Sequence, residues 1–169
     1  VNNEKVWIFD NGSYGYAAGE MTYADPSTTV EWNNWSANWD PGVGHTGDDA
    51  IWESTMTFGL KGGANVTVYN SSSKETASGT FMLNTSNHTI TFTDCELLHT
   101  PSWSDRSTNW SRDLKLLELD ENHMRIGVMR DNSEGPWWLI WNFVSKEYAD
   151  NYVPEDKPDP EPALPDGWE

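Results

Sequence analysis

The 169-residue sequence predicts an all-β fold: an antiparallel β-sandwich of the jelly-roll type, with eight or nine strands and no major helix. Two observations favour this fold class. Short runs of alternating apolar and polar residues recur about every ten residues, and turn-forming residues separate them. No stretch has the apolar spacing of an amphipathic helix. A closed up-and-down barrel would have the same strand spacing, so it stays open as an alternative.

The most strongly apolar stretch, residues 135–144, contains three of the eleven Trp residues and no charged residue. Alternation along a strand places Trp137 and Trp141 on one face and Trp138 and Asn142 on the other. Because both faces are largely apolar, this strand should be buried centrally, or another part of the chain should cover its second face.

The remaining strands are predicted from the same alternation, at residues 5–10, 50–60, 65–70, 79–83, 89–98, 114–119 and 124–130. Two polar segments that contain Trp, residues 31–49 and 99–112, interrupt the series and are expected to be long loops. Long loops are uncommon in compact domains and often carry function, so these two segments are the first places to look for a site.

The composition changes near residue 153. Residues 153–169 include five Pro and six acidic residues, a composition that cannot build an apolar core. We therefore expect a β-domain over residues 1–152, followed by an acidic Pro-rich linker over residues 153–169 that joins further domains of the same polypeptide.

The charge balance excludes several partners. Ten Lys and Arg residues stand against 27 Asp and Glu residues, for a net charge of −17, which argues against nucleic-acid binding. No apolar run reaches the ~20 residues that a membrane-spanning helix needs, so membrane insertion is not expected. The single cysteine, Cys95, cannot form an intramolecular disulfide and is predicted to be buried. Abundant Asn, Thr, Ser and Trp are typical of an extracellular or cell-surface bacterial domain, here expected to be a monomer.

Metal and catalytic motifs are weak. The four His residues are scattered without metal-ligand spacing, and no cofactor is expected. Asp48 and Asp49, with the turn at residues 40–44, could supply oxygen ligands to a structural Ca²⁺. An enzymatic alternative, a glycoside hydrolase or polysaccharide lyase, would use Glu53 with Glu118 or Glu96. Among 27 acidic residues such a pair carries little weight, so no catalytic residue is assigned.

The aromatic residues of the polar loops give the strongest functional signal. Sugar rings present a face of C–H groups, which stacks on Trp, and a rim of hydroxyl groups, which polar side chains bind. The stacking candidates are Trp35, Trp39, Trp103, Trp110 and Trp138, and the hydrogen-bonding candidates are Asn38, Asp40, Arg106, Arg125 and Asn142. The structural alternative is that the loop Trp residues close the ends of the fold, and that Trp138 packs under a crossing loop.

The stretches EKVWIFDN, DDAIWESTMTFGLKGGANVTV, ASGTFMLN and WWLIWNFV, within about residues 4–148, resemble β-sandwich carbohydrate-binding modules of secreted bacterial proteins that degrade or capture glycans. The resemblance implies non-catalytic binding of a polysaccharide or oligosaccharide. The net charge should repel uronic-acid polymers, so a neutral β-glucan or related plant glycan is the expected ligand. A protein–protein adhesion domain remains an alternative and would present a large flat apolar patch.

Overall fold

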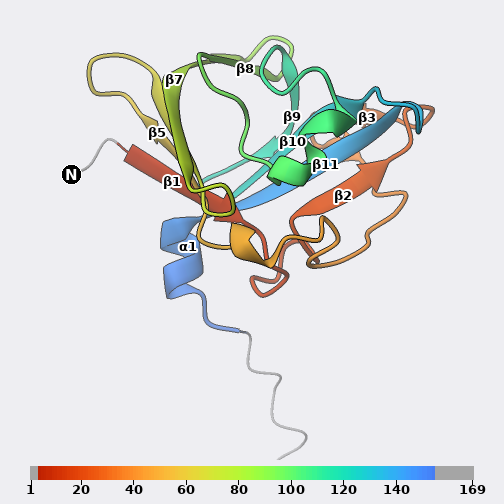
Figure 1. Ribbon diagram of the computed structural model, residues 1–169, viewed down its shortest axis with the longest axis horizontal. Coiled ribbons are helices and arrows are strands. Elements are labelled where there is room, and N and C mark those ends of the chain that lie inside the picture. Colours follow the sequence, from red (N-terminus) through yellow and green to blue (C-terminus); the bar gives the residue numbers. More distant parts are fainter. Residues whose placement is uncertain (1–3, 155–169) are drawn as a thin grey trace, which may run out of the picture.

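An eight-stranded antiparallel β-barrel forms the body of the protein in the computed structural model, which describes residues 4–154 (Figure 1). Each strand pairs with the next in the order β1, β5, β6, β7, β8, β9, β10, β11, and β11 pairs with β1 to close the barrel. The strands are β1 (Glu4–Phe9), β5 (Thr55–Gly59), β6 (Asn65–Asn70), β7 (Glu75–Asn84), β8 (Thr89–Thr93), β9 (Leu114–Leu119), β10 (His123–Arg130) and β11 (Trp137–Ser145).

The predicted β-sandwich is therefore wrong, although the all-β class is confirmed. Trp7 of β1 lies opposite Ser145 of β11, and Phe9 lies opposite Phe143, so the first and last barrel strands share a ladder. The alternation of apolar and polar residues determines which face of a strand is buried, but it does not determine which strand edges meet. A β-sandwich and a β-barrel show the same alternation along their strands. They differ here in the pairing of β1 with β11, which closes the barrel.

The long connection between β1 and β5 adds further elements to the barrel. Strand β2 (Met21–Ala24) pairs with the first half of β11, beyond the part that β1 occupies. Strands β3 (Val30–Glu31) and β4 (Asn34–Trp35) form a separate two-stranded ribbon. The helices are minor, as predicted. Between residues 4 and 154 they are the two 3-10 helices η1 (Asp49–Ile51) and η2 (Pro101–Arg106) and the short helix α1 (Lys146–Asn151).

Strand β11 is covered on both faces, as its sequence indicates. Leu139, Trp141 and Phe143 point into the barrel and belong to its main core. Ile140 lies on the outer face, in a second apolar cluster with Ala24, Val30 and Leu117. Residues of the β1–β5 connection therefore cover the outer face of β11, and the aromatic run is not an exposed surface.

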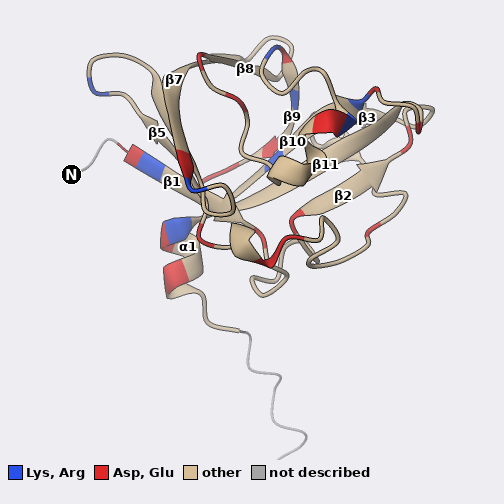
Figure 2. Cartoon of the chain, viewed as in Figure 1, with Lys and Arg blue, Asp and Glu red and all other residues tan. Residues whose placement is uncertain are grey.

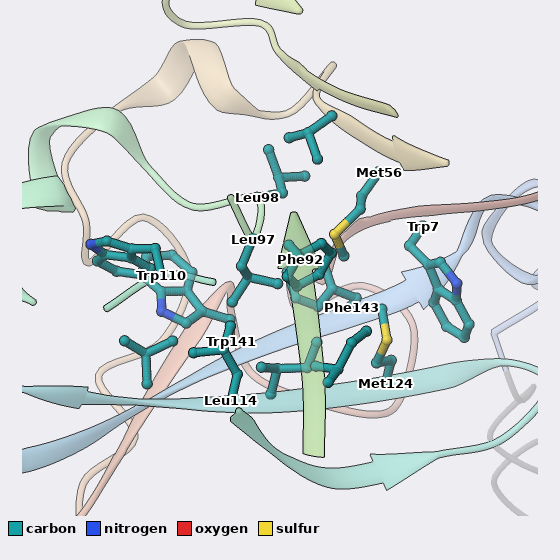
Figure 3. Close-up of a cluster of buried hydrophobic side chains, with 14 of the residues drawn as sticks. Trp7, Met56, Phe92, Leu97, Leu98, Trp110, Leu114, Met124, Trp141 and Phe143 are labelled. Atoms are coloured by element: carbon teal, nitrogen blue, oxygen red, sulfur yellow. The ribbon is translucent and has the colours of Figure 1, made fainter. Parts of the chain in front are cut away.

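Large side chains pack much of the barrel interior, in a cluster that extends from Trp110 and Trp141 at one side to Trp7 and Met124 at the other (Figure 3). A glycine permits one close approach in the wall around this core. A Cβ atom on Gly79 would lie 1.9 Å from the carbonyl oxygen of Thr93. β7 and the end of β8 can touch only because this side chain is absent.

The barrel has two unlike ends. At one, which we call the loop end, lie the long connections of residues 10–54 and 94–113 and the turn of residues 131–136. At the other, the hairpin end, short turns of residues 60–64, 85–88 and 120–122 join the strands. The predicted linker at residues 153–169 lies, from residue 155 onward, outside the described residues.

Candidate binding surface at the loop end

Trp39 is the most exposed aromatic residue of the predicted set, with 52% of its surface accessible to solvent. Its ring lies flat on the ring of Tyr23, with a centroid distance of 4.8 Å and an interplanar angle of 10°. The ring of His45 meets Trp39 edge-on, at a centroid distance of 5.0 Å. Because Tyr23 covers one face of the indole, the exposed area lies mainly on the opposite face, where a flat ligand can stack.

Backbone hydrogen bonds hold Trp39 in this position. The Tyr23 N–H donates to the Trp39 carbonyl at 2.9 Å, and the Asn38 N–H donates to the Tyr23 carbonyl at 2.9 Å. The Asn38 side-chain oxygen accepts the Asp25 N–H at 2.7 Å, and Asp40 Oδ1 accepts the Gly42 N–H at 3.2 Å. The indole is therefore fixed before any ligand arrives, which lowers the entropic cost of binding.

A buried carboxylate anchors the adjoining loop. Glu20 is fully buried, and its two oxygens accept the Gly44 N–H at 2.8 Å and both the N–H and the hydroxyl of Thr46, at 3.2 and 2.6 Å. His45, between these two residues, shares a hydrogen bond of 2.9 Å between its Nε2 and the Tyr23 hydroxyl. Glu20 thus holds the loop that supports Tyr23 and, through it, Trp39.

Charged side chains lie close to Tyr23. Arg106 lies over the Trp103 ring, whose centroid is 6.3 Å from that of Tyr23. Burial raises the pKa of the Tyr23 phenol, Arg130 and Arg106 oppose that rise, and Glu134 adds to it. Glu134 is 3.6 Å from Arg106 Nε and 3.7 Å from an Arg130 terminal nitrogen. The neighbourhood of Trp39 therefore offers both hydrogen-bond donors and acceptors to a hydroxylated ligand.

Trp103 and Trp110, also predicted to stack on a ligand, lie instead in the core, with exposures of 8% and 3%. The Trp110 indole N–H donates to the carbonyls of Ser104 and Ser107, and its ring stacks on His99 at 3.6 Å. Arg106 lies over the Trp103 ring at 4.9 Å. These two Trp residues close the loop end of the barrel, as the structural alternative for the loop Trp residues proposed. Neither offers a ring face to a ligand.

The other predicted platform, on the barrel wall, is covered by the β1–β5 connection. Asn142 is fully buried, and its amide donates to the Gly19 carbonyl at 3.0 Å and the Thr22 hydroxyl at 2.9 Å. Trp138 is partly buried in the outer apolar cluster, with the Lys115 ammonium 5.1 Å from its ring centroid. Asn142 is therefore a structural residue that ties the connection to β11.

Arg125 and Trp35 also belong to the contact between the barrel wall and the β1–β5 connection. The Arg125 guanidinium lies between the rings of Tyr16, at 4.1 Å, and Trp35, at 4.9 Å. Glu118 accepts the Trp35 indole N–H at 3.2 Å and the Tyr16 hydroxyl, and lies 3.7 Å from Arg125 Nε. Tyr16 and Trp35 both come from the β1–β5 connection, so this cluster fastens that connection to β9 and β10.

The enzymatic alternative pairs Glu53 with Glu118 or Glu96. The structure does not bring Glu53 and Glu118 together. Glu53 precedes β5, and Glu118 lies on β9 in the wall cluster, with three strands between them along the sheet. A separate cleft of about 570 Å³, lined in part by β7 and residues 94–99, contains His99, whose Nε2 accepts the Ser104 hydroxyl at 2.8 Å. Burial lowers the pKa of His99 to about 4, so this His is a weak base toward Ser104.

Within residues 4–154, no group of three or more His, Cys, Asp or Glu side chains is placed to hold a metal ion. Of the predicted calcium ligands, Asp48 accepts the Ala50 N–H at 2.9 Å and the Ser72 hydroxyl. Cys95 is buried, as predicted. Over the same residues, no helix has the length and apolar character required to span a membrane.

The structure adds three residues that the sequence argument missed. Tyr23 and His45 support Trp39, and Trp137 meets the Tyr23 ring edge-on at 6.4 Å. Tyr23 lies in a stretch without apolar periodicity, and His45 is one of four scattered His residues, so neither carried a local signal. The sequence shows Trp137 as an aromatic residue at the start of a strand, but it does not show which residues Trp137 contacts.

No protein-family model matches the chain, and no curated protein matches it in sequence. The surface around Trp39 and the chemistry of its residues are therefore the basis for a functional proposal.

Proposed function

We propose that the protein binds a polysaccharide without cleaving it, and that Trp39 is the residue on which a sugar ring stacks. The observation that carries this proposal is the Trp39 ring, which is 52% exposed while one of its faces is covered by Tyr23. A flat, fixed indole beside hydrogen-bonding groups matches the amphipathic shape of a pyranose ring.

Asn38 and Asp40 flank Trp39 in the chain, and Arg106 and Glu134 lie around the Tyr23 that supports it. In this surface Asn38 and Asp40 would accept or donate hydrogen bonds at the hydroxyl rim, and Arg106 would donate to ring or hydroxyl oxygens. Trp103, Trp110 and Asn142 are not part of the proposed surface, because they are buried.

A neutral β-glucan or a related plant glycan is the proposed ligand. The chain has a net charge of −17, and acidic residues are spread over the loops, over strands such as β1 and β7, and over α1 (Figure 2). A polyuronate would meet this negative field on approach from any side. Asp40 and Glu134 beside the platform disfavour such a ligand further.

Affinity electrophoresis in gels that contain mixed-linkage β-glucan, xyloglucan, galactomannan or polygalacturonate tests this proposal. We expect one or more of the neutral polymers to retard the wild-type protein, while polygalacturonate leaves its mobility unchanged. Retardation by polygalacturonate alone, or by none of the polymers, would contradict the proposal.

An assay for released reducing ends on the same polymers separates binding from hydrolysis. We expect no release, because three strands of the sheet separate Glu53 from Glu118. Release of reducing ends that is lost in Glu53→Gln would instead support the glycoside-hydrolase alternative.

A further inference from the structure

A second cavity lies at the hairpin end of the barrel, opposite the Trp39 surface. It encloses about 540 Å³, and its walls are formed by side chains from β1, β5, β7, β8, β9 and β10. The apolar lining residues are Trp7, Phe58, Leu60, Phe81, Leu83, Ile90, Leu119 and Met124. We call this the hairpin-end cavity.

The strand register shows that this cavity is the unfilled part of the barrel interior. Phe81 lies opposite Phe92, and Leu83 lies opposite Ile90, so these residues share the inward face of β7 and β8. Toward the loop end, Trp141 and its neighbours pack the barrel interior (Figure 3). Eight-stranded barrels have room either for their own side chains or for one small ligand. In this barrel, the protein's own side chains fill the loop end, and space remains at the hairpin end.

Several of the lining side chains are more exposed than apolar residues of a barrel interior usually are. Leu60 is 66% exposed and Leu83 is 41% exposed, and Phe58 and Phe81 are only partly buried. Grouped apolar exposure in a concave site favours a ligand, whereas isolated exposed apolar residues need no explanation. The volume lies within the range of about 300–1,000 Å³ that is typical of small-molecule sites.

The charges at the mouth of the cavity define which ligand fits. Lys5 faces inward, with its ammonium 5.6 Å from the Trp7 ring centroid, while Glu4 and Asp120 also line the opening. One positive and two negative side chains give no net attraction for an anionic head group, and the chain as a whole is strongly negative. A carboxylate or phosphate is therefore disfavoured. An ammonium group inside the cavity would lose its hydration and would meet the Lys5 ammonium beside the Trp7 ring, so it is disfavoured as well. A hydroxyl group could bond any of the three side chains.

We propose that the hairpin-end cavity binds a small uncharged apolar molecule, with an aliphatic or aromatic body and at most a hydroxyl group at the mouth. This site is separate from the Trp39 surface and does not depend on the proposed glycan binding. A flat protein partner fits less well, because the apolar lining is concave and recessed within the ring of strands.

Titration of the whole chain with N-phenyl-1-naphthylamine, an uncharged dye that fluoresces in apolar surroundings, tests the proposal. We expect saturable binding at one site per chain. Decanol, decanoate and decylammonium, which share one chain length, then compete with the dye. Decanol should displace it at the lowest concentration. A lower displacing concentration for either charged competitor would overturn the assignment of an uncharged ligand.

Two neighbouring residues of β7 provide matched variants. Phe81 lines the cavity, whereas Met82, 61% exposed, is the next residue along the strand and lies on the outer face. Phe81→Ala should weaken dye binding about tenfold, and Met82→Ala should leave it unchanged. Leu83→Trp, which fills the cavity, should abolish it. Near-ultraviolet circular dichroism checks that each variant is folded.

Three results would refute the proposal. The first is the absence of saturable dye binding by the folded wild-type chain. The second is an equal loss of binding in Phe81→Ala and Met82→Ala. The third is a dimer, seen by sedimentation, that dissociates as the dye binds, because the cavity would then be covered by a second copy of the chain.

Discussion

Burial of His99 predicts that the protein loses stability as the pH falls from 7 to 5. The His99 side chain is stacked on Trp110 and only 7% of the residue is exposed. Its ring nitrogens form hydrogen bonds with the Leu97 carbonyl at 2.6 Å and with the Ser104 hydroxyl at 2.8 Å. Burial lowers the pKa of His99 from 6.5 to about 4, and the hydrogen bond to Leu97 opposes the shift only in part.

The size of the effect follows from proton linkage. Between pH 6.5 and 4 the unfolded chain takes up a proton on His99 that the native state does not. The stability that this residue contributes is therefore complete above the unfolded pKa and is lost as the pH falls toward the native pKa. At pH 5 the expected loss is about 2 kcal/mol of unfolding free energy, because each pKa unit corresponds to about 1.4 kcal/mol.

Urea unfolding, followed by Trp fluorescence at pH 7, 6 and 5, measures this loss in the wild type and in His99→Gln. The stability difference between the two proteins should shrink by about 2 kcal/mol from pH 7 to 5. Burial raises the pKa of Asp10, whose contribution grows as the pH falls, but it is present in both proteins and cancels. His88→Asn, which leaves His99 intact, should retain the wild-type slope. Parallel curves for the wild type and His99→Gln would refute the reasoning.

Other substitutions test the packing of the loop end and the barrel wall. Trp110→Ala should lower the unfolding free energy by about 3–5 kcal/mol, measured by urea unfolding, because it empties a core position. Glu20→Ala should cost about 3 kcal/mol and speed hydrogen exchange in residues 42–46, because three donors lose their acceptor, two of them buried on Thr46. Gly79→Val should lower the melting temperature, with a cost of at least about 1–3 kcal/mol, because its Cβ would collide with the Thr93 carbonyl.

Local sequence patterns predicted the individual strands better than their assembly. Residues 65–70 and 114–119 form strands with the predicted bounds, because alternation and adjacent turns are local properties. Strand β2 was missed since both of its faces are buried, which removes the alternation. Closure of the barrel depends on the pairing of Trp7 with Ser145, a contact between the two ends of the domain that no local pattern encodes.

The candidate site was predicted only in part, for a similar reason. Trp39, Trp103 and Trp110 all lie in polar stretches of the sequence and look alike there. The loop of Trp39 lies on Tyr23 at the surface, whereas the segment that carries the other two turns into the barrel end. Residues that are distant in sequence decide which indole is exposed, and neither composition nor spacing can report them.

Calorimetric titration of Trp39→Ala with the neutral polysaccharide that binds the wild type most tightly measures the contribution of the Trp39 ring to glycan binding. Loss of a stacked indole should weaken binding about 30-fold, equivalent to about 2 kcal/mol. Trp32→Ala is the matched control, because Trp32 is a partly buried Trp that stacks on His88 and lies outside the Trp39 surface. Trp32→Ala should retain the wild-type affinity. Unchanged affinity in a folded Trp39→Ala protein would contradict the proposed stacking on Trp39.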